Sequence, residues 1–289
     1  MWTRFHFLVG SGLLAIASPA YATFQFSTGS PDCRIATASQ PGGGGQLEIE
    51  TADDFVLTQE TLITNGTFTG LVPINTDATN IGNVIIEIYR VFPLDSTSPP
   101  SGNVPTRNNS PSDVAFTSAS LSLGQLAVTT TTLSTSFFAS NSVVNGINGI
   151  NSVPGVFTGG EGAVSGQETL FTFSLATPLD LAAGHYFFVP QVQLSTGNFL
   201  WLSAAHPVVA PGTPFPNGFT DLQTWIRNGS LAPDWLRVGT DITQQGPFNA
   251  AFSLNGVGVP EPETWTMMLA GFAALGLALR RQRRKLAAA

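Results

Sequence analysis

The sequence predicts an all-β fold: a single, jelly-roll-like β-sandwich over residues 23–256. Short stretches rich in β-branched and aromatic residues alternate there with turn-forming Gly, Pro, Asn and Ser residues. No amphipathic helix of ordinary length interrupts this pattern, and the body is long enough for a core of ordinary size. On either side of the body we expect an N-terminal signal peptide and a short C-terminal transmembrane helix.

The clearest strand covers residues 84–92, which are nearly all β-branched or aromatic, as a central position in a sheet requires. Residues around Gly184 predict a turn that leads into another strand. In that strand Tyr186 and Phe188 share one face, because successive side chains alternate between the two faces. Further strands are expected over residues 61–68, 125–133, 169–175 and 198–203, and long loops over 96–112 and 208–218.

The first 22 residues have the order of a secretory signal. Arg4 precedes an apolar stretch over residues 7–17 that is too short for a stable membrane span. The small residues Ala20 and Ala22 then flank the expected cleavage site, which we place after Ala22. This order predicts that the body leaves the cytoplasm.

The body is strongly acidic, because residues 23–258 hold 16 Asp and Glu side chains against five Arg and no Lys. Such a surface repels phosphate backbones, so we do not expect nucleic-acid binding. The chain has one cysteine, Cys33, and therefore forms no intrachain disulfide. Cys33 lies well inside the mature chain, away from the position of a lipid anchor, and we interpret it as an incidental or buried thiol.

The C-terminal segment, residues 257–289, has three parts in direct succession. A short proline-rich string contains Pro260, Glu261 and Pro262, and an apolar run over residues 265–279 follows it. A basic tail over 280–289 then carries the membrane-stop charges, which are Arg280, Arg281, Arg283, Arg284 and Lys285. The order of these parts predicts a transmembrane helix with its basic end in the cytoplasm and the body outside.

The apolar run is short for a membrane span. Its 15 residues rise about 22 Å as a helix, against a hydrocarbon thickness of about 30 Å. Arg side chains that reach the interface, local thinning of the bilayer and Trp265 at the opposite interface can close this gap. The alternative, an amphipathic helix that closes the domain, requires a polar face, and none occurs within the run.

Together these three parts resemble the PEP-CTERM sorting domain of Gram-negative bacteria. The resemblance implies that an exosortase, a membrane-embedded protease-transpeptidase, recognises Pro260-Glu261-Pro262 and removes the tail. It also implies a link to exopolysaccharide and the biofilm matrix. Because each Pro fixes φ and lacks an N–H, we expect residues 260–262 to be extended, with the carboxylate pointing outward. The location predicted for the body is first the periplasm, at the inner membrane, and then the cell surface or the extracellular matrix.

Candidate catalytic or binding residues are few. The acidic pair Asp53 and Asp54 is interpreted as a solvated turn, with a weaker reading as calcium ligands. A glycosidase needs two carboxylates that face one cleft, and adjacent strand residues point to opposite faces, so the pair does not fit that role. The mature chain keeps two histidines, His185 and His206, whose spacing does not favour a zinc site. No cofactor other than calcium is expected.

Three tryptophans, Trp201, Trp225 and Trp235, are candidates for a sugar-stacking platform, and the alternative is that they fill the core. Trp225 and Trp235 each stand two residues before an Arg, which places each Arg on the same strand face as its Trp. Three functions remain open. The first is a non-enzymatic structural or adhesive protein of the envelope or matrix, the second is a carbohydrate-binding module, and the third is an extracellular hydrolase.

Overall fold

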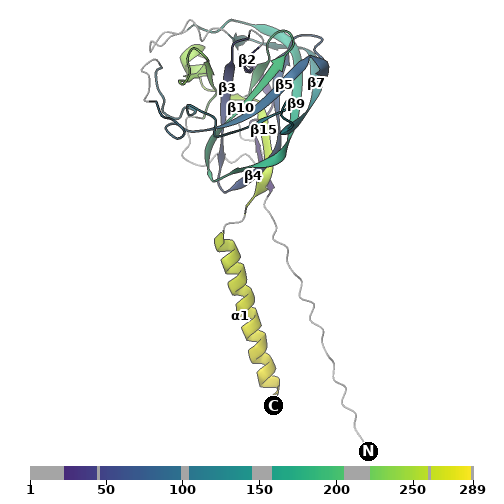
Figure 1. The fold of residues 1–289 in the computed structure, drawn as a ribbon, viewed down its shortest axis with the longest axis vertical. Helices are drawn as coiled ribbons and strands as arrows, with labels where there is room; N and C mark the ends of the chain where they lie inside the picture. Colours follow the sequence, from purple (N-terminus) through teal and green to yellow (C-terminus); the bar gives the residue numbers. More distant parts are fainter. Residues whose placement is uncertain are drawn as a thin grey trace, which may run out of the picture.

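The computed structural model describes residues 23–43, 46–98, 104–144, 158–204, 222–259 and 262–287. Within these ranges the chain forms two β-sheets and one C-terminal α-helix (Figure 1). The all-β class predicted for the body is confirmed, since its described residues hold only two short helical turns, η1 (Ala78–Asn80) and η3 (Val238–Ile242). The expected signal peptide, with Ala20 and Ala22, lies outside the described residues.

The larger sheet has nine strands, and all its pairings are antiparallel except the parallel pair β2–β8. Its main order is β1-β15-β4-β11-β2-β8, with β14 beside β11, β9 beside β4, and β7 beside β9. The strands are β1 Thr23–Ser27, β2 Pro31–Ala38, β4 Thr61–Val72, β7 Leu126–Ala139, β8 Asn141–Val143, β9 Val164–Leu181, β11 Leu200–Ala204, β14 Asn249–Ala250 and β15 Phe252–Gly258.

The smaller sheet has six antiparallel strands in the order β13-β12-β3-β10-β5-β6. They are β3 Ile49–Leu57, β5 Ile81–Arg90, β6 Thr117–Ser120, β10 Gly184–Leu194, β12 Trp225–Asn228 and β13 Leu236–Arg237. All nine residues of β3 are buried, because both faces of this sheet are covered. Two-sided burial explains why the middle of β10, from Tyr186 to Pro190, reads as a continuous apolar run rather than as an alternating pattern.

An aromatic core joins the two sheets. Phe188 of β10 packs at 5.1 Å from Phe252 of β15 and at 5.8 Å from Phe173 of β9, measured between ring centroids. Trp201 of β11 meets Phe188 edge-on at 5.8 Å. The inner faces of both sheets therefore share one core, while Phe187 and Val189 on the opposite face of β10 belong to a second apolar cluster.

The predicted strands are present. The predicted strand over residues 84–92 overlaps β5, which ends at Arg90 and lies between β10 and β6, and the other four predicted segments overlap β4, β7, β9 and β11. Gly184 opens β10 after the turn, and Tyr186 and Phe188 share the core face as expected. In β4, a Cβ at Gly66 would overlap the carbonyl oxygen of Ser253, so the close approach of β4 and β15 requires glycine there. The expected loop over 208–218 lies outside the described residues.

The two ends of the body are paired. Strand β1 runs antiparallel to β15 from Thr23 opposite Val257 to Ser27 opposite Ser253. After β15, the backbone N–H of Val259 donates to the carbonyl oxygen of Glu60. The body therefore remains hydrogen-bonded up to the residue before Pro260.

Helix α1 (Pro262–Ala287) follows and extends away from the two sheets (Figure 1). It includes the basic segment and begins at Pro262, so the expectation that Pro262 is extended is wrong. Proline suits the first helical position because the N–H it lacks would have no partner inside the helix. Pro260 and Glu261 lie outside the described residues.

Candidate functional sites

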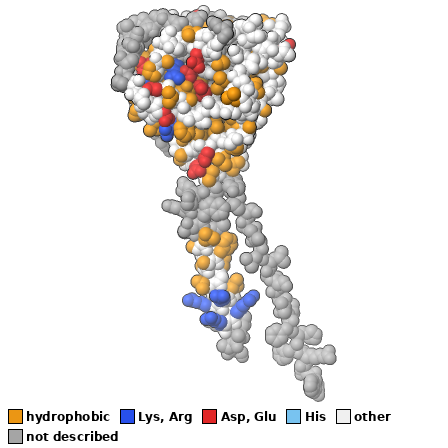
Figure 2. Space-filling view, in the orientation of Figure 1, with side chains coloured by type: hydrophobic (Ala, Val, Ile, Leu, Met, Phe, Trp, Pro, Cys, Tyr) orange, Lys and Arg blue, Asp and Glu red, His pale blue; other side chains and the backbone are white. Residues whose placement is uncertain are grey.

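The exposed helix α1 carries the first candidate site, a sorting signal. The side chains from Leu269 to Arg284 are all exposed, including Leu269 at 68% and Leu275 at 62%. Figure 2 shows apolar side chains along the helix and Lys or Arg side chains gathered near its far end. The membrane-stop arginines Arg280, Arg281, Arg283 and Arg284 are exposed there, while the side chain of Lys285 lies outside the described part.

No helix in the described part of the chain is both long and apolar enough to cross a membrane. The transmembrane helix expected over residues 265–279 is therefore not supported.

The acidic pair Asp53 and Asp54 lies in the middle of the buried strand β3, so the interpretation as a solvated turn is wrong. The two side chains point to opposite faces, as expected. Asp53 accepts hydrogen bonds from Thr224 Oγ1 at 2.9 Å and from the backbone N–H of Ala250. Burial raises the pKa of the Asp53 carboxyl well above its usual value, and the charge of Asp54 adds to this shift.

On the other face, Asp54 lies 3.0 Å from Nε2 of His185, with Asp54 on β3 and His185 on the neighbouring strand β10. Both side chains are almost fully buried. His206 lies outside the described residues. Among the described residues no group of three His, Cys, Asp or Glu side chains could hold a metal ion, so the structure does not assemble the calcium site considered for Asp53 and Asp54.

The three candidate sugar-stacking tryptophans are all fully buried. Trp201 belongs to the core between the sheets, and its Nε1 donates to the carbonyl oxygen of Ala251 at 2.9 Å. Trp225 and Trp235 belong to the cluster on the outer face of the smaller sheet. Sugar stacking requires an exposed ring face, so these three residues do not form the candidate platform and instead pack in the core, which was the other reading.

A network of charges lies on the same outer face, and we call it the outer-face network. It comprises the buried residues Glu50, Tyr89 and Arg227 and the half-buried Glu87. Arg227 Nε donates to Glu50 Oε2, and Arg227 Nη2 donates to Tyr89 Oη at 2.9 Å. Tyr89 Oη in turn donates to Glu50 Oε1 at 2.5 Å. The Arg227 guanidinium also lies 4.3 Å from the ring centroid of Trp235.

The electrostatics of this network favour neutral acids beside one ion pair. Burial, together with the charge of the neighbouring Glu50 carboxylate, raises the pKa of Glu87 to about 8. Burial and both glutamates also raise the pKa of the Tyr89 phenol. Figure 2 shows acidic and basic side chains gathered on one face of the body. In this network the Glu50 carboxylate neutralises the buried Arg227 guanidinium.

Sequence reasoning missed this network. The Trp-x-Arg spacing correctly places Arg227 on the face of Trp225, but Glu50 and Tyr89 come from β3 and β5, which only the sheet order brings near β12. A second buried group is similar: Arg107 pairs with Asp234 at 2.8 Å and with Asp113 at 3.0 Å. It fastens the segment around residues 104–113 to the turn before β13.

Cys33 is exposed, so the reading of a buried thiol is wrong and the incidental one remains. Its φ of 62° lies in the left-handed region.

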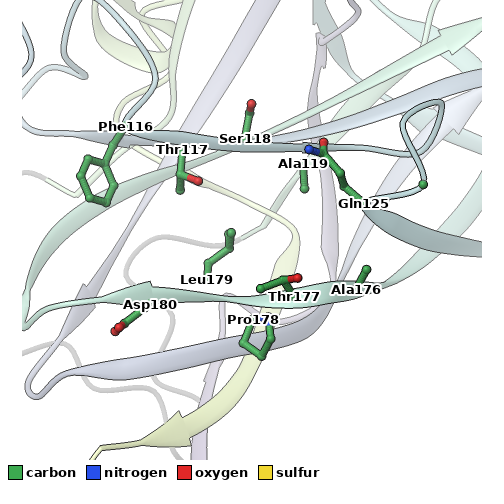
Figure 3. A pocket seen from close by; sticks show the side chains of 11 residues that line it. Phe116, Thr117, Ser118, Ala119, Gln125, Ala176, Thr177, Pro178, Leu179 and Asp180 are labelled. Carbon is green, nitrogen blue, oxygen red and sulfur yellow. The ribbon is translucent and has the colours of Figure 1, made fainter.

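An open cleft of about 620 Å³ lies between β6 and the end of β9. Figure 3 shows Thr117 and Ala119 pointing from β6 toward β9, and Leu179 pointing back toward β6. Gln125 and Thr177 add polar groups to the lining, and Phe116 lies at one end. Of the 11 lining residues only Asp180 is charged, so the cleft combines the apolar side chains of Ala119 and Leu179 with hydroxyl and amide groups.

Comparison with known protein families matches residues 258–284 to the PEP-CTERM protein-sorting motif. No curated protein and no solved structure matches the chain. The matched residues are the end of β15, the proline string and α1 as far as its arginines, in agreement with the resemblance noted in the sequence. The chain thus carries a C-terminal PEP-CTERM protein-sorting motif, which implies an exported protein with a membrane-anchored sorting signal that an exosortase recognises.

Proposed function

We propose that this chain is a non-enzymatic structural or adhesive protein of the bacterial envelope or extracellular matrix, delivered there by exosortase processing at Pro260-Glu261-Pro262. The observation that carries the proposal is the match of residues 258–284 to the sorting motif. In this proposal the body, a β-sandwich in our interpretation, is the part that remains after processing.

The position of the motif supports processing without damage to the body. Strand β15 ends at Gly258, and it is hydrogen-bonded to β1 on one side and to β4 on the other. Cleavage at or after Pro260 therefore breaks no strand. In the proposed precursor, the exposed apolar side chains of α1 hold the tail at the inner membrane until it is processed.

A non-enzymatic role is supported by the use that the body makes of its acids. Asp53 accepts hydrogen bonds from Thr224 and Ala250, and Glu50 neutralises Arg227. Four of the five arginines in the body form ion pairs, and the fifth, Arg34, donates to the carbonyl oxygen of Gln245. Most of these charged groups are thus engaged within the fold. For the exposed surface of the body we propose exopolysaccharide as the partner.

The test is co-expression with an exosortase and measurement of the intact mass of the mature protein. We expect the product to lose the segment that contains α1 when the exosortase is active, and to keep it when the active-site cysteine of the exosortase is replaced. A Pro260→Ala/Pro262→Ala variant should keep its tail in both cases. An identical mass with active and inactive exosortase would refute the proposal.

A second candidate function, carbohydrate binding, is favoured by the cleft between β6 and β9. Its volume of about 620 Å³ suits a small ligand, and its hydroxyl and amide groups can pair with sugar hydroxyls beside the apolar side chains of Ala119 and Leu179. Binding to an array of neutral glycans should weaken in the Thr117→Val/Thr177→Val variant, which removes two hydroxyls but keeps the shape of the side chains. The control is Thr172→Val on the exposed face of β9, and equal binding by both variants would exclude the cleft.

A further inference from the structure

Strand β7 is a long edge strand. It pairs with β9 along one side, and in the described part of the chain no strand pairs with its other side. Most of its 14 residues are exposed or half-buried. An edge of this kind presents a row of backbone N–H and C=O groups that can pair with a further strand.

The edge of β7 lacks the protection that natural edge strands usually have. Natural sheets usually avoid pairing with other chains by having very short edge strands, or charged side chains or proline on the edge. The other edge strands here follow this rule in length: β1 has five residues, β6 four, β8 three and β13 two. Strand β7 is far longer, and it contains no charged residue and no proline.

The regular part of β7 is its first half. From Leu126 opposite Leu175 to Thr132 opposite Thr169, the register with β9 is continuous, and irregularities begin after Thr132. A bulge bends a strand and disturbs pairing, so residues 126–132 form the part that can template another strand. The midpoint of this part is Thr129.

We propose that the body self-associates by antiparallel pairing of residues 126–132 of β7 with the same residues of a second copy, about a two-fold axis at Thr129. In this arrangement Thr129 faces Thr129 of the second copy, and Val128 faces Thr130. Pairs of β-branched residues directly opposite one another stabilise antiparallel sheets. The two nine-stranded sheets then join into one.

Charge explains why two copies would meet at this strand rather than elsewhere on their surfaces. The body is strongly acidic, so two copies repel one another over most of their surfaces. The seven residues from Leu126 to Thr132 are all uncharged, so their pairing brings no like charges together. The inference goes beyond the proposed function and does not depend on processing by an exosortase.

Disulfide cross-linking of the full chain tests the geometry. Residues opposite one another in an antiparallel pair have Cα atoms about 4.5–5.5 Å apart, within the range that a disulfide bridges. Thr129→Cys should therefore give a disulfide-linked dimer on mild oxidation. Cys33 must first be replaced because it is exposed, and Cys33→Asn suits its left-handed backbone.

The matched control is Thr172→Cys in the same background. Thr172 lies on β9 directly opposite Thr129 and is likewise exposed. It is one strand further from the edge of the sheet. In the dimer the two copies of Thr172 are three strand spacings, about 14 Å, apart and cannot form a disulfide. We expect a cross-linked dimer with Thr129→Cys and monomer with Thr172→Cys, in detergent that keeps the α1 helices apart.

Sedimentation of the full chain without cysteine provides a second measurement. Thr129→Lys should convert a dimer into a monomer because two lysines would then face one another, whereas Thr172→Lys should remain dimeric. The proposal is overturned by a monomeric parent chain, by equal cross-linking of the two cysteine variants, or by capture of a different protein at Thr129→Cys in place of the second copy.

Discussion

The substitution Arg227→Met tests whether the outer-face network stabilises the fold. The Arg227 side chain is 8% exposed and the Glu50 side chain 7%, so both charges of this pair are buried. Methionine retains the length of the side chain and its packing on Trp235, but it leaves the Glu50 carboxylate without its cation. Arg227 also donates to Tyr89 Oη and to the carbonyl oxygen of Asp113, and these bonds are lost as well.

Removal of one partner of a buried ion pair costs about 3–5 kcal/mol in the free energy of unfolding, because the remaining charge is uncompensated. In a protein of this size each kcal/mol lowers the Tm by about 2–4 °C, so we expect a fall of about 10 °C. Urea denaturation at pH 7 should show a lower midpoint with an unchanged m-value.

Two further variants make the measurement decisive. The double variant Arg227→Met/Glu50→Gln removes both charges, so it should recover part of the stability lost in Arg227→Met. Asp95→Asn breaks the Arg90–Asp95 pair, whose side chains are 32% and 18% exposed, and should cost less than about 1 kcal/mol. If Arg227→Met loses no more stability than Asp95→Asn, the network does not stabilise the fold and the reasoning fails.

Three other outcomes are expected. The folded-state pKa of Glu87 is about 8, above the 4.5 of an unperturbed Glu, so the folded protein holds this proton more tightly and stability falls as pH rises between these values. Glu87→Gln should remove this slope and raise stability at pH 8 by up to about 4 kcal/mol. Trp201→Ala should cost about 3–5 kcal/mol by thermal unfolding, since the indole is fully buried between the sheets, whereas Thr172→Ala on the exposed face should change stability little. Gly66→Ala should shift the urea midpoint downward because the added methyl group would overlap the carbonyl oxygen of Ser253. The control is Gly124→Asn: Gly124 is exposed with open space around it, and asparagine tolerates its positive φ. A normal midpoint for Gly66→Ala would show that β4 and β15 are further apart than described.

Local chemistry in the sequence was enough to predict several strands and the tail. Residues 84–92 can bury β-branched side chains on both faces, and this property is visible without knowledge of the neighbouring strands. The sorting motif is also local, since its proline string, apolar run and arginines are adjacent in the chain and act through their order. For the same reason the opposite orientations of Asp53 and Asp54 followed from strand alternation alone.

The tertiary structure decided where these side chains lie relative to the rest of the molecule. Asp53 and Asp54 suggested a turn because carboxylates are costly to bury, yet Thr224, Ala250 and His185 supply partners from segments more than 100 residues away. The indoles of Trp201, Trp225 and Trp235 are core residues because two sheets and their covering segments enclose them. Likewise, the pairing of Glu50 with Arg227 and the unpaired edge of β7 depend on the order of strands in the sheets, and strand order arises from contacts between distant segments that no local pattern encodes.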